Sequence, residues 1–141
     1  MRQAMLTVAI VATAMLAGGC GSKNAYQTVA VSGTIKYDDG STIPAARIEL
    51  QFVPQAAEID IKTKPKLGVA EVNVEDGSFE VASTYDYGDG LVVGKHKVLA
   101  AALAEPVGYL DSIPPEFRDI KKTSLEVDTS NKPFEIVIPK P

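Results

Sequence analysis

Apolar and polar residues alternate along most of the chain after residue 28, and this pattern predicts β-strands. Between residues 29 and 37, Val31, Ile35 and Tyr37 face one side, while polar residues such as Lys36 face the other. A period of two is typical of a strand with one buried face. The segment 47–54 alternates in the same way and ends at a proline, so it is predicted as a second strand.

Five further segments complete a predicted set of seven strands. They are residues 67–74, 78–84, 95–103, 125–127 and 134–138. Asp76-Gly77 is the strongest hairpin signal, because glycine tolerates the positive φ that tight turns require. The alanines after Leu99 favour a helix by propensity, but the alternation through His96 and Val98 favours a strand.

Seven short strands separated by turn residues predict an all-β fold in which two sheets pack as a β-sandwich. A domain of about this size buries roughly two thirds of its extended-chain surface, so one core without disulfides is feasible. Prolines make residues 104–122 a crossing loop, with one helical turn at Pro115–Asp119. The residues predicted to face inward are Val31, Ile35, Ile48, Leu50, Phe52, Val72, Phe79, Val81, Val98, Leu125, Val127, Phe134 and Ile136.

The amino terminus has the three parts of an export signal. Arg2 precedes an apolar run from Met5 to Ala17, and small residues follow it. As a helix this run would extend about 20 Å, whereas a bilayer core of roughly 30 Å needs about 20 residues. The run is therefore too short to span a membrane and remain there, which is typical of a signal peptide.

The residues at the end of this run resemble the lipobox of bacterial lipoproteins. Gly18, Gly19 and Cys20 match its last three positions, although Ala17 stands where leucine is usual. The resemblance implies that residues 1–19 are removed, that Cys20 carries the lipid, and that residues 20–28 form a short tether. An ordinary secretory signal with an unmodified thiol is the alternative.

Composition narrows the function classes. The chain has 14 Lys and Arg against 18 Asp and Glu, a formal net charge of −4. Nucleic acid is therefore not expected as a partner, since phosphate binding needs a concentrated basic surface. One Cys excludes an internal disulfide, and one His excludes sites that need two imidazoles. We expect no catalytic site, no cofactor and no bound metal, because the HExxH, GxxxxGK[ST] and GxGxxG motifs are also missing.

Two charged groups leave alternatives open. Asp86, Asp89 and Asp111 offer oxygen ligands for calcium, but Asp-Gly pairs are first of all turn formers. The lysines of the segment IKTKPK form the one concentrated positive patch; they are Lys62, Lys64 and Lys66. These lysines would meet anionic lipid headgroups or an acidic polysaccharide, or they form a solvated strand edge protected by charge.

Tyr85, Tyr87 and Tyr109 all fall in predicted loops. Exposed tyrosines are what the rim of a sugar or peptide site uses, so these three are a candidate binding rim. Tyrosines that simply close the end of the sandwich are the alternative. His96 is the one imidazole available to a Ser-His-Asp set, yet its position in the predicted strand faces inward.

Several segments together carry a family resemblance. They are Val31–Ile35 (VSGTI), Ala46–Pro54 (ARIELQFVP), Glu75–Phe79 (EDGSF), Gly88–Gly90 (GDG), Gly94–Val98 (GKHKV), Ile113–Asp119 (IPPEFRD) and Thr123–Leu125 (TSL). In this order and spacing, residues 29–139 resemble the bacterial carboxypeptidase regulatory-like lipoproteins. The resemblance implies a transthyretin-like or immunoglobulin-like sandwich, exported and lipid-anchored. The chain departs from the family at His96, where tyrosine is common.

The expected function is therefore a non-catalytic lipoprotein of the bacterial cell envelope, on its periplasmic or outer face. Membrane lipid is its expected partner through acylated Cys20, with an envelope protein or polysaccharide as a further candidate partner. A carbohydrate-binding module is one alternative. An accessory domain of an envelope hydrolase system, or a hydrolase that uses His96 as its base, is another.

Overall fold

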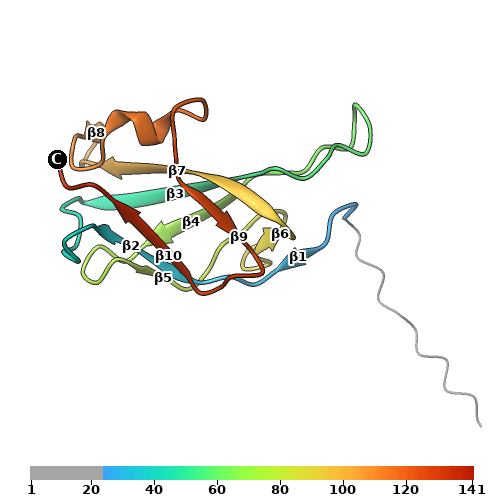
Figure 1. The fold of residues 1–141 in the computed structure, drawn as a ribbon, viewed down its shortest axis with the longest axis horizontal. Coiled ribbons are helices and arrows are strands. Elements are labelled where there is room, and N and C mark those ends of the chain that lie inside the picture. The colour runs from blue at the N-terminus through green and yellow to red at the C-terminus, as the bar shows by residue number, and fades with distance from the viewer. Residues whose placement is uncertain (1–23) are drawn as a thin grey trace, which may run out of the picture.

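The computed structural model describes residues 24–141, and this part of the chain is nearly all β-structure (Figure 1). The predicted signal peptide and Cys20 lie outside the described residues. The elements in chain order are β1 (Thr28–Val29), β2 (Gly33–Tyr37), β3 (Arg47–Pro54), β4 (Gly68–Val72), β5 (Ser78–Phe79), β6 (Leu91–Val92), β7 (Lys95–Leu103), β8 (Tyr109–Leu110), the 3₁₀ helix η1 (Pro115–Arg118), β9 (Glu126–Asp128) and β10 (Phe134–Ile138). The expected all-β class is confirmed. Within residues 24–141, no helix is long and apolar enough to cross a membrane.

The strands form three sheets. The largest has the order β4-β3-β7-β8, and β9 also pairs with β7. The second has the order β10-β2-β5, and its β10–β2 pair is parallel, whereas its β2–β5 pair is antiparallel. The third is the short β1–β6 pair. Figure 1 shows β2, β5 and β10 along one side of the molecule, with β3 and β7 along another.

Side chains from the two larger sheets meet in one apolar core. The ring of Phe52 on β3 lies 5.9 Å from that of Phe79 on β5 and 6.1 Å from that of Phe134 on β10, measured between centroids. All three residues are almost fully buried. The core thus joins strands that are distant in the sequence, and its apolar burial is the main term that favours folding.

The longest pairing joins β3 to β7, in register from Arg47 opposite Leu103 to Pro54 opposite His96. Along β7, buried and partly exposed residues alternate as predicted. Ala100 and Ala102 are each 1% exposed and face the core. The strand predicted at 95–103 is confirmed, because pairing and burial override the helix propensity of alanine.

The alternation fails in one predicted strand. The segment 78–84 pairs with β2 only over β5, and Ser83 then forms an isolated bridge with Val69 of β4. Between these points the chain passes from one sheet to the other, so the period of two is lost. Ala82 is buried, whereas Val81, which was expected to face inward, is 39% exposed, and that prediction is wrong.

Other differences are smaller. The structure has ten strands in the described residues where seven were expected. The segment 29–37 is divided into β1 and β2, and the two-residue strands β6 and β8 were not expected. Leu125 and Val127 are half-buried and pack against the core instead of lying within it. The other inward-facing predictions are confirmed for Val31, Ile35, Ile48, Leu50, Phe52, Val72, Phe79, Val98, Phe134 and Ile136.

Candidate functional site

The outer edge of β4 is paired at both ends and open in the middle. At one end Val69 and Ser83 exchange two backbone hydrogen bonds of 2.9 Å. At the other end the N–H of Asn73 donates to the carbonyl of Ser78, and the N–H of Gly77 donates to the carbonyl of Asn73, both at 2.8 Å. The chain between Ser78 and Ser83 therefore leaves β4 and returns to it.

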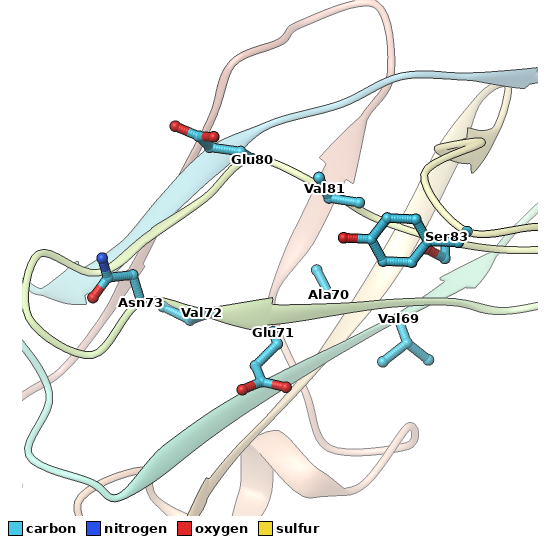
Figure 2. Close-up of a pocket in the computed structure, with 9 residues that line it drawn as sticks. Val69, Ala70, Glu71, Val72, Asn73, Glu80, Val81 and Ser83 are labelled. Carbon is cyan, nitrogen blue, oxygen red and sulfur yellow. The ribbon is translucent and has the colours of Figure 1, made fainter.

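Glu71 lies in the middle of this opening. In an antiparallel strand, backbone groups two residues apart point to the same edge. The N–H and C=O groups of Glu71 therefore point the same way as those of Val69 and Asn73, toward the segment 80–82, which forms no strand. Figure 2 shows the separation between β4 and this segment, with the side chain of Ala70 directed into it. The opening thus presents a backbone donor and acceptor that β-pairing does not use.

This opening is a hollow with a volume of about 590 Å³. We call it the β4 groove. Its lining residues are Val69, Ala70, Glu71, Val72, Asn73, Glu80, Val81, Ser83 and Tyr87. The set combines apolar side chains with two carboxylates and an amide, and it includes no Lys or Arg. Such a lining suits a neutral or positively charged ligand with hydrogen-bonding groups.

Tyr87 is placed beside the groove by a loop that Asp89 holds together. One carboxylate oxygen of Asp89 accepts a hydrogen bond from the N–H of Thr84 (2.7 Å), and the other accepts from Tyr85 (3.0 Å) and Asp86 (3.2 Å). Burial by itself would raise the pKa of Asp89, but these N–H donors outweigh it and lower the pKa below its usual range. The loop therefore presents Tyr87, which is 90% exposed, at the groove.

Asp89, one of the three candidate calcium ligands, binds backbone groups of its own loop. The carboxylate of Asp89 is already occupied by backbone N–H groups of its own loop, which is the turn-forming role that an Asp-Gly pair favours. In residues 24–141, no three His, Cys, Asp or Glu side chains gather closely enough to hold a metal ion.

The three tyrosines of the candidate rim lie in different surroundings. The Lys66 ammonium lies 5.8 Å from the centroid of the Tyr85 ring, and Tyr85 is half-buried. Tyr109 lies in β8, not in a loop as expected, and the guanidinium of Arg118 stacks 4.6 Å from its ring centroid. Tyr109 lines a separate, smaller hollow. Only Tyr87 of the three lines the β4 groove.

His96 is inside the protein, as its strand position predicts. It is 1% exposed, its Nδ1 lies 3.2 Å from the carbonyl oxygen of Gly94, and its ring meets that of Phe52 edge-on. Its Nε2 has no hydrogen-bond partner. Burial lowers the pKa of His96, and the Gly94 carbonyl and the Asp128 carboxylate only partly oppose this effect. The imidazole is therefore neutral and out of reach of a substrate at the surface.

The β4 groove was not expected from the sequence. The alternation assigns Val81, which lines the groove, to the core, whereas the structure exposes it. A segment that passes from one sheet to another has no characteristic amino-acid composition. The alternation of polar and apolar residues therefore does not reveal such a change. Comparison of the chain with models of known protein families, with curated proteins and with solved structures finds no match.

Proposed function

We propose that the protein is an exported, lipid-anchored and non-catalytic β-sandwich that serves as a binding module at the bacterial cell envelope. The observation that carries this proposal is the sequence Gly18-Gly19-Cys20 directly after the apolar run from Met5 to Ala17. Cleavage before Cys20 would leave the one cysteine of the chain at the new amino terminus, where acyl chains attach. The resemblance to carboxypeptidase regulatory-like lipoproteins agrees with this assignment.

The shared core supports the sandwich architecture. Phe52 belongs to the five-stranded sheet, whereas Phe79 and Phe134 belong to the three-stranded sheet, and their rings pack together. Side chains that interdigitate between two β-sheets are what defines a sandwich core. A transthyretin-like or immunoglobulin-like sandwich is the arrangement we propose for residues 29–139.

The placement of His96 supports a non-catalytic role. A general base must reach its substrate within hydrogen-bond distance or through one water molecule. The imidazole of His96 lies in the core and is kept neutral by burial. A hydrolase that depends on the one histidine of this chain would therefore have to unfold part of its core to act.

In the mechanism that follows, the lipid anchor displays the β-structure at the membrane surface. One acyl chain gives only marginal membrane binding, whereas two or three hold a protein firmly, because each buried methylene adds about 0.8 kcal/mol. The anchor would concentrate a rigid β-structure at the membrane, where the β4 groove meets a partner in the envelope. Loops and open strand edges on a rigid scaffold are the usual places for such contacts.

The experiment that tests the anchor is Cys20→Ser in the full chain, followed by detergent phase separation. The unaltered protein is expected in the detergent phase, and the variant is expected in the aqueous phase or as an unprocessed precursor. Ser22→Ala, next to the same site, is the matched control and keeps the distribution of the unaltered protein. If Cys20→Ser is processed and enters the detergent phase as before, the lipoprotein assignment is wrong.

A carbohydrate ligand is the second candidate, and the exposure of Tyr87 favours it. An aromatic ring that is 90% exposed beside hydrogen-bonding side chains is a suitable platform for a sugar ring. Retention of the protein on immobilised envelope polysaccharide tests this candidate. Tyr87→Ala is expected to lose most of the retention, while Tyr109→Ala, at a separate hollow, keeps it. Equal retention of both variants and the unaltered protein would dismiss the sugar-binding role.

A further inference from the structure

A hairpin projects from the sheets between β3 and β4. We call residues 55–66 the basic hairpin; Figure 1 shows it extending well beyond the strands. At its tip, the N–H of Ile59 donates to the carbonyl of Thr63 at 3.1 Å. One carboxylate oxygen of Asp60 accepts hydrogen bonds from the N–H groups of Lys62 (2.7 Å) and Thr63 (2.8 Å). The backbone of the tip therefore forms a hydrogen-bonded turn.

Two exposed apolar side chains alternate with Asp60 at this tip, and lysines follow them. Ile61 is 89% exposed and Ile59 is 61% exposed. Lys62 lies next to Ile61, and Lys64 and Lys66 follow along the returning side of the hairpin. These isoleucines lie too far from the sheets to be buried in the core. Exposed aliphatic residues flanked by lysines are typical of segments that lie at the boundary between lipid headgroups and acyl chains.

Tyr26 joins the beginning of the described chain to this tip. Its hydroxyl oxygen lies 3.0 Å from the carbonyl oxygens of both Ala57 and Thr63, and it accepts a hydrogen bond of 3.1 Å from the N–H of Ile59. Tyr26 follows Cys20 by six residues, which extend at most about 21 Å. A lipid attached at Cys20 would therefore hold the tip of the hairpin close to the membrane surface.

We propose that the basic hairpin is a membrane-docking element: Ile59 and Ile61 enter the headgroup and acyl boundary of an anionic bilayer, and the neighbouring lysines contact its phosphates. This inference rests on the proposed function, because the anchor at Cys20 supplies the proximity. Two observations favour an anionic membrane as the surface that this hairpin contacts. Three lysines outnumber Glu58 and Asp60 on this hairpin in a chain of net charge −4, although Lys64 pairs with Glu58 at 3.2 Å. The hairpin is also fastened through Tyr26 to the segment that leads to the anchor. The docked hairpin and the anchor would together fix how the β-structure is oriented on the membrane.

The test uses the full-length protein, purified with its anchor and reconstituted into vesicles of phosphatidylglycerol and phosphatidylcholine. Ile61→Cys provides a thiol for a polarity-sensitive fluorophore. Val107→Cys is the matched control, because Val107 is also apolar, is 88% exposed and belongs to the distant loop between β7 and β8. Spin-labelled lipids in the bilayer quench a fluorophore only where it contacts them.

The label at position 61 is expected to shift to shorter wavelength and to be quenched at least about threefold more than the label at position 107. Lys62→Glu combined with Lys64→Glu and Lys66→Glu should remove most of this difference, and so should Tyr26→Phe, which cannot hold the tether against the hairpin. Equal quenching at both positions, in protein that floats with the vesicles, would overturn the docking proposal while leaving the anchor intact. Protein that does not float with the vesicles contradicts the anchor, and the docking proposal falls with it.

Discussion

The two edges of the strand pair β3–β4 differ in how completely their backbones are used. On the β3 side, pairing with β7 continues over eight positions, and the side chains alternate regularly between buried and exposed. On the β4 side, pairing holds at Val69 and Asn73 but is missing around Glu71. The first edge contributes to the core, and the second contributes the β4 groove. The part of the sheet that stabilises the fold is thus separate from the part that leaves backbone groups open, where we propose that a partner binds.

The regular edge contains residues whose loss leaves a cavity. We expect Phe52→Ala to lower the free energy of unfolding by about 3–5 kcal/mol, because Phe52 is fully buried against two other rings. Val81→Ala, beside the groove, is expected to change it by no more than about 0.5 kcal/mol, since the side chain is partly in solvent. Urea unfolding of both variants measures these values. A similar loss for both would mean that the two regions are equally well packed.

Gly90 joins the loop that carries Tyr87 to the small β1–β6 sheet. Its φ is +88°, and a Cβ at this position would lie 1.9 Å from the carbonyl oxygen of Val29. We expect Gly90→Ala to cost more than about 2 kcal/mol, because both the strained backbone and this clash oppose it. Gly88→Ala is the control: its φ is +76°, but the nearest atom, on Val81, is 3.8 Å away. It should cost about 1–2 kcal/mol, and equal losses would show that the clash has no effect.

The core also contains one group that responds to pH. Burial lowers the folded-state pKa of His96 below its ordinary value of 6.5, so the unfolded chain binds a proton more readily than the folded protein does. The contribution of His96 to the free energy of unfolding is therefore fully present above about pH 6.5. It is lost as the pH drops below that value, by at most about 1.4 kcal/mol per pH unit. His96→Leu should remove this slope. Urea midpoints between about pH 7 and pH 5.5 measure it, and an unchanged slope in the variant would assign the effect to other groups.

The sequence predicts this structure well where the backbone is regularly paired. The alternation of polar and apolar residues identifies β3, β7 and β10, and it places His96 in the core despite its polar ring. It fails where pairing changes, as between Phe79 and Ser83, because the period of two holds only for a continuous strand.

The candidate site could be predicted only in part for the same reason. Tyr87 is recognised as an exposed loop tyrosine, but the groove beside it forms from backbone groups around Glu71 that carry no sequence signal. Tyr109 resembles Tyr87 in the sequence, yet it stacks with Arg118 at a different hollow. Tyr26 also gave no signal, because its contacts with the basic hairpin join residues more than thirty positions apart.

The central claim is that Cys20 becomes the lipidated first residue of the mature protein. Mass spectrometry of the amino-terminal peptide, from protein extracted from its own membranes, tests this claim most directly. We predict a peptide that begins at Cys20 and carries the added mass of a diacylglycerol group. A chain that retains residues 1–19, or that begins near this point with an unmodified thiol, would contradict the claim.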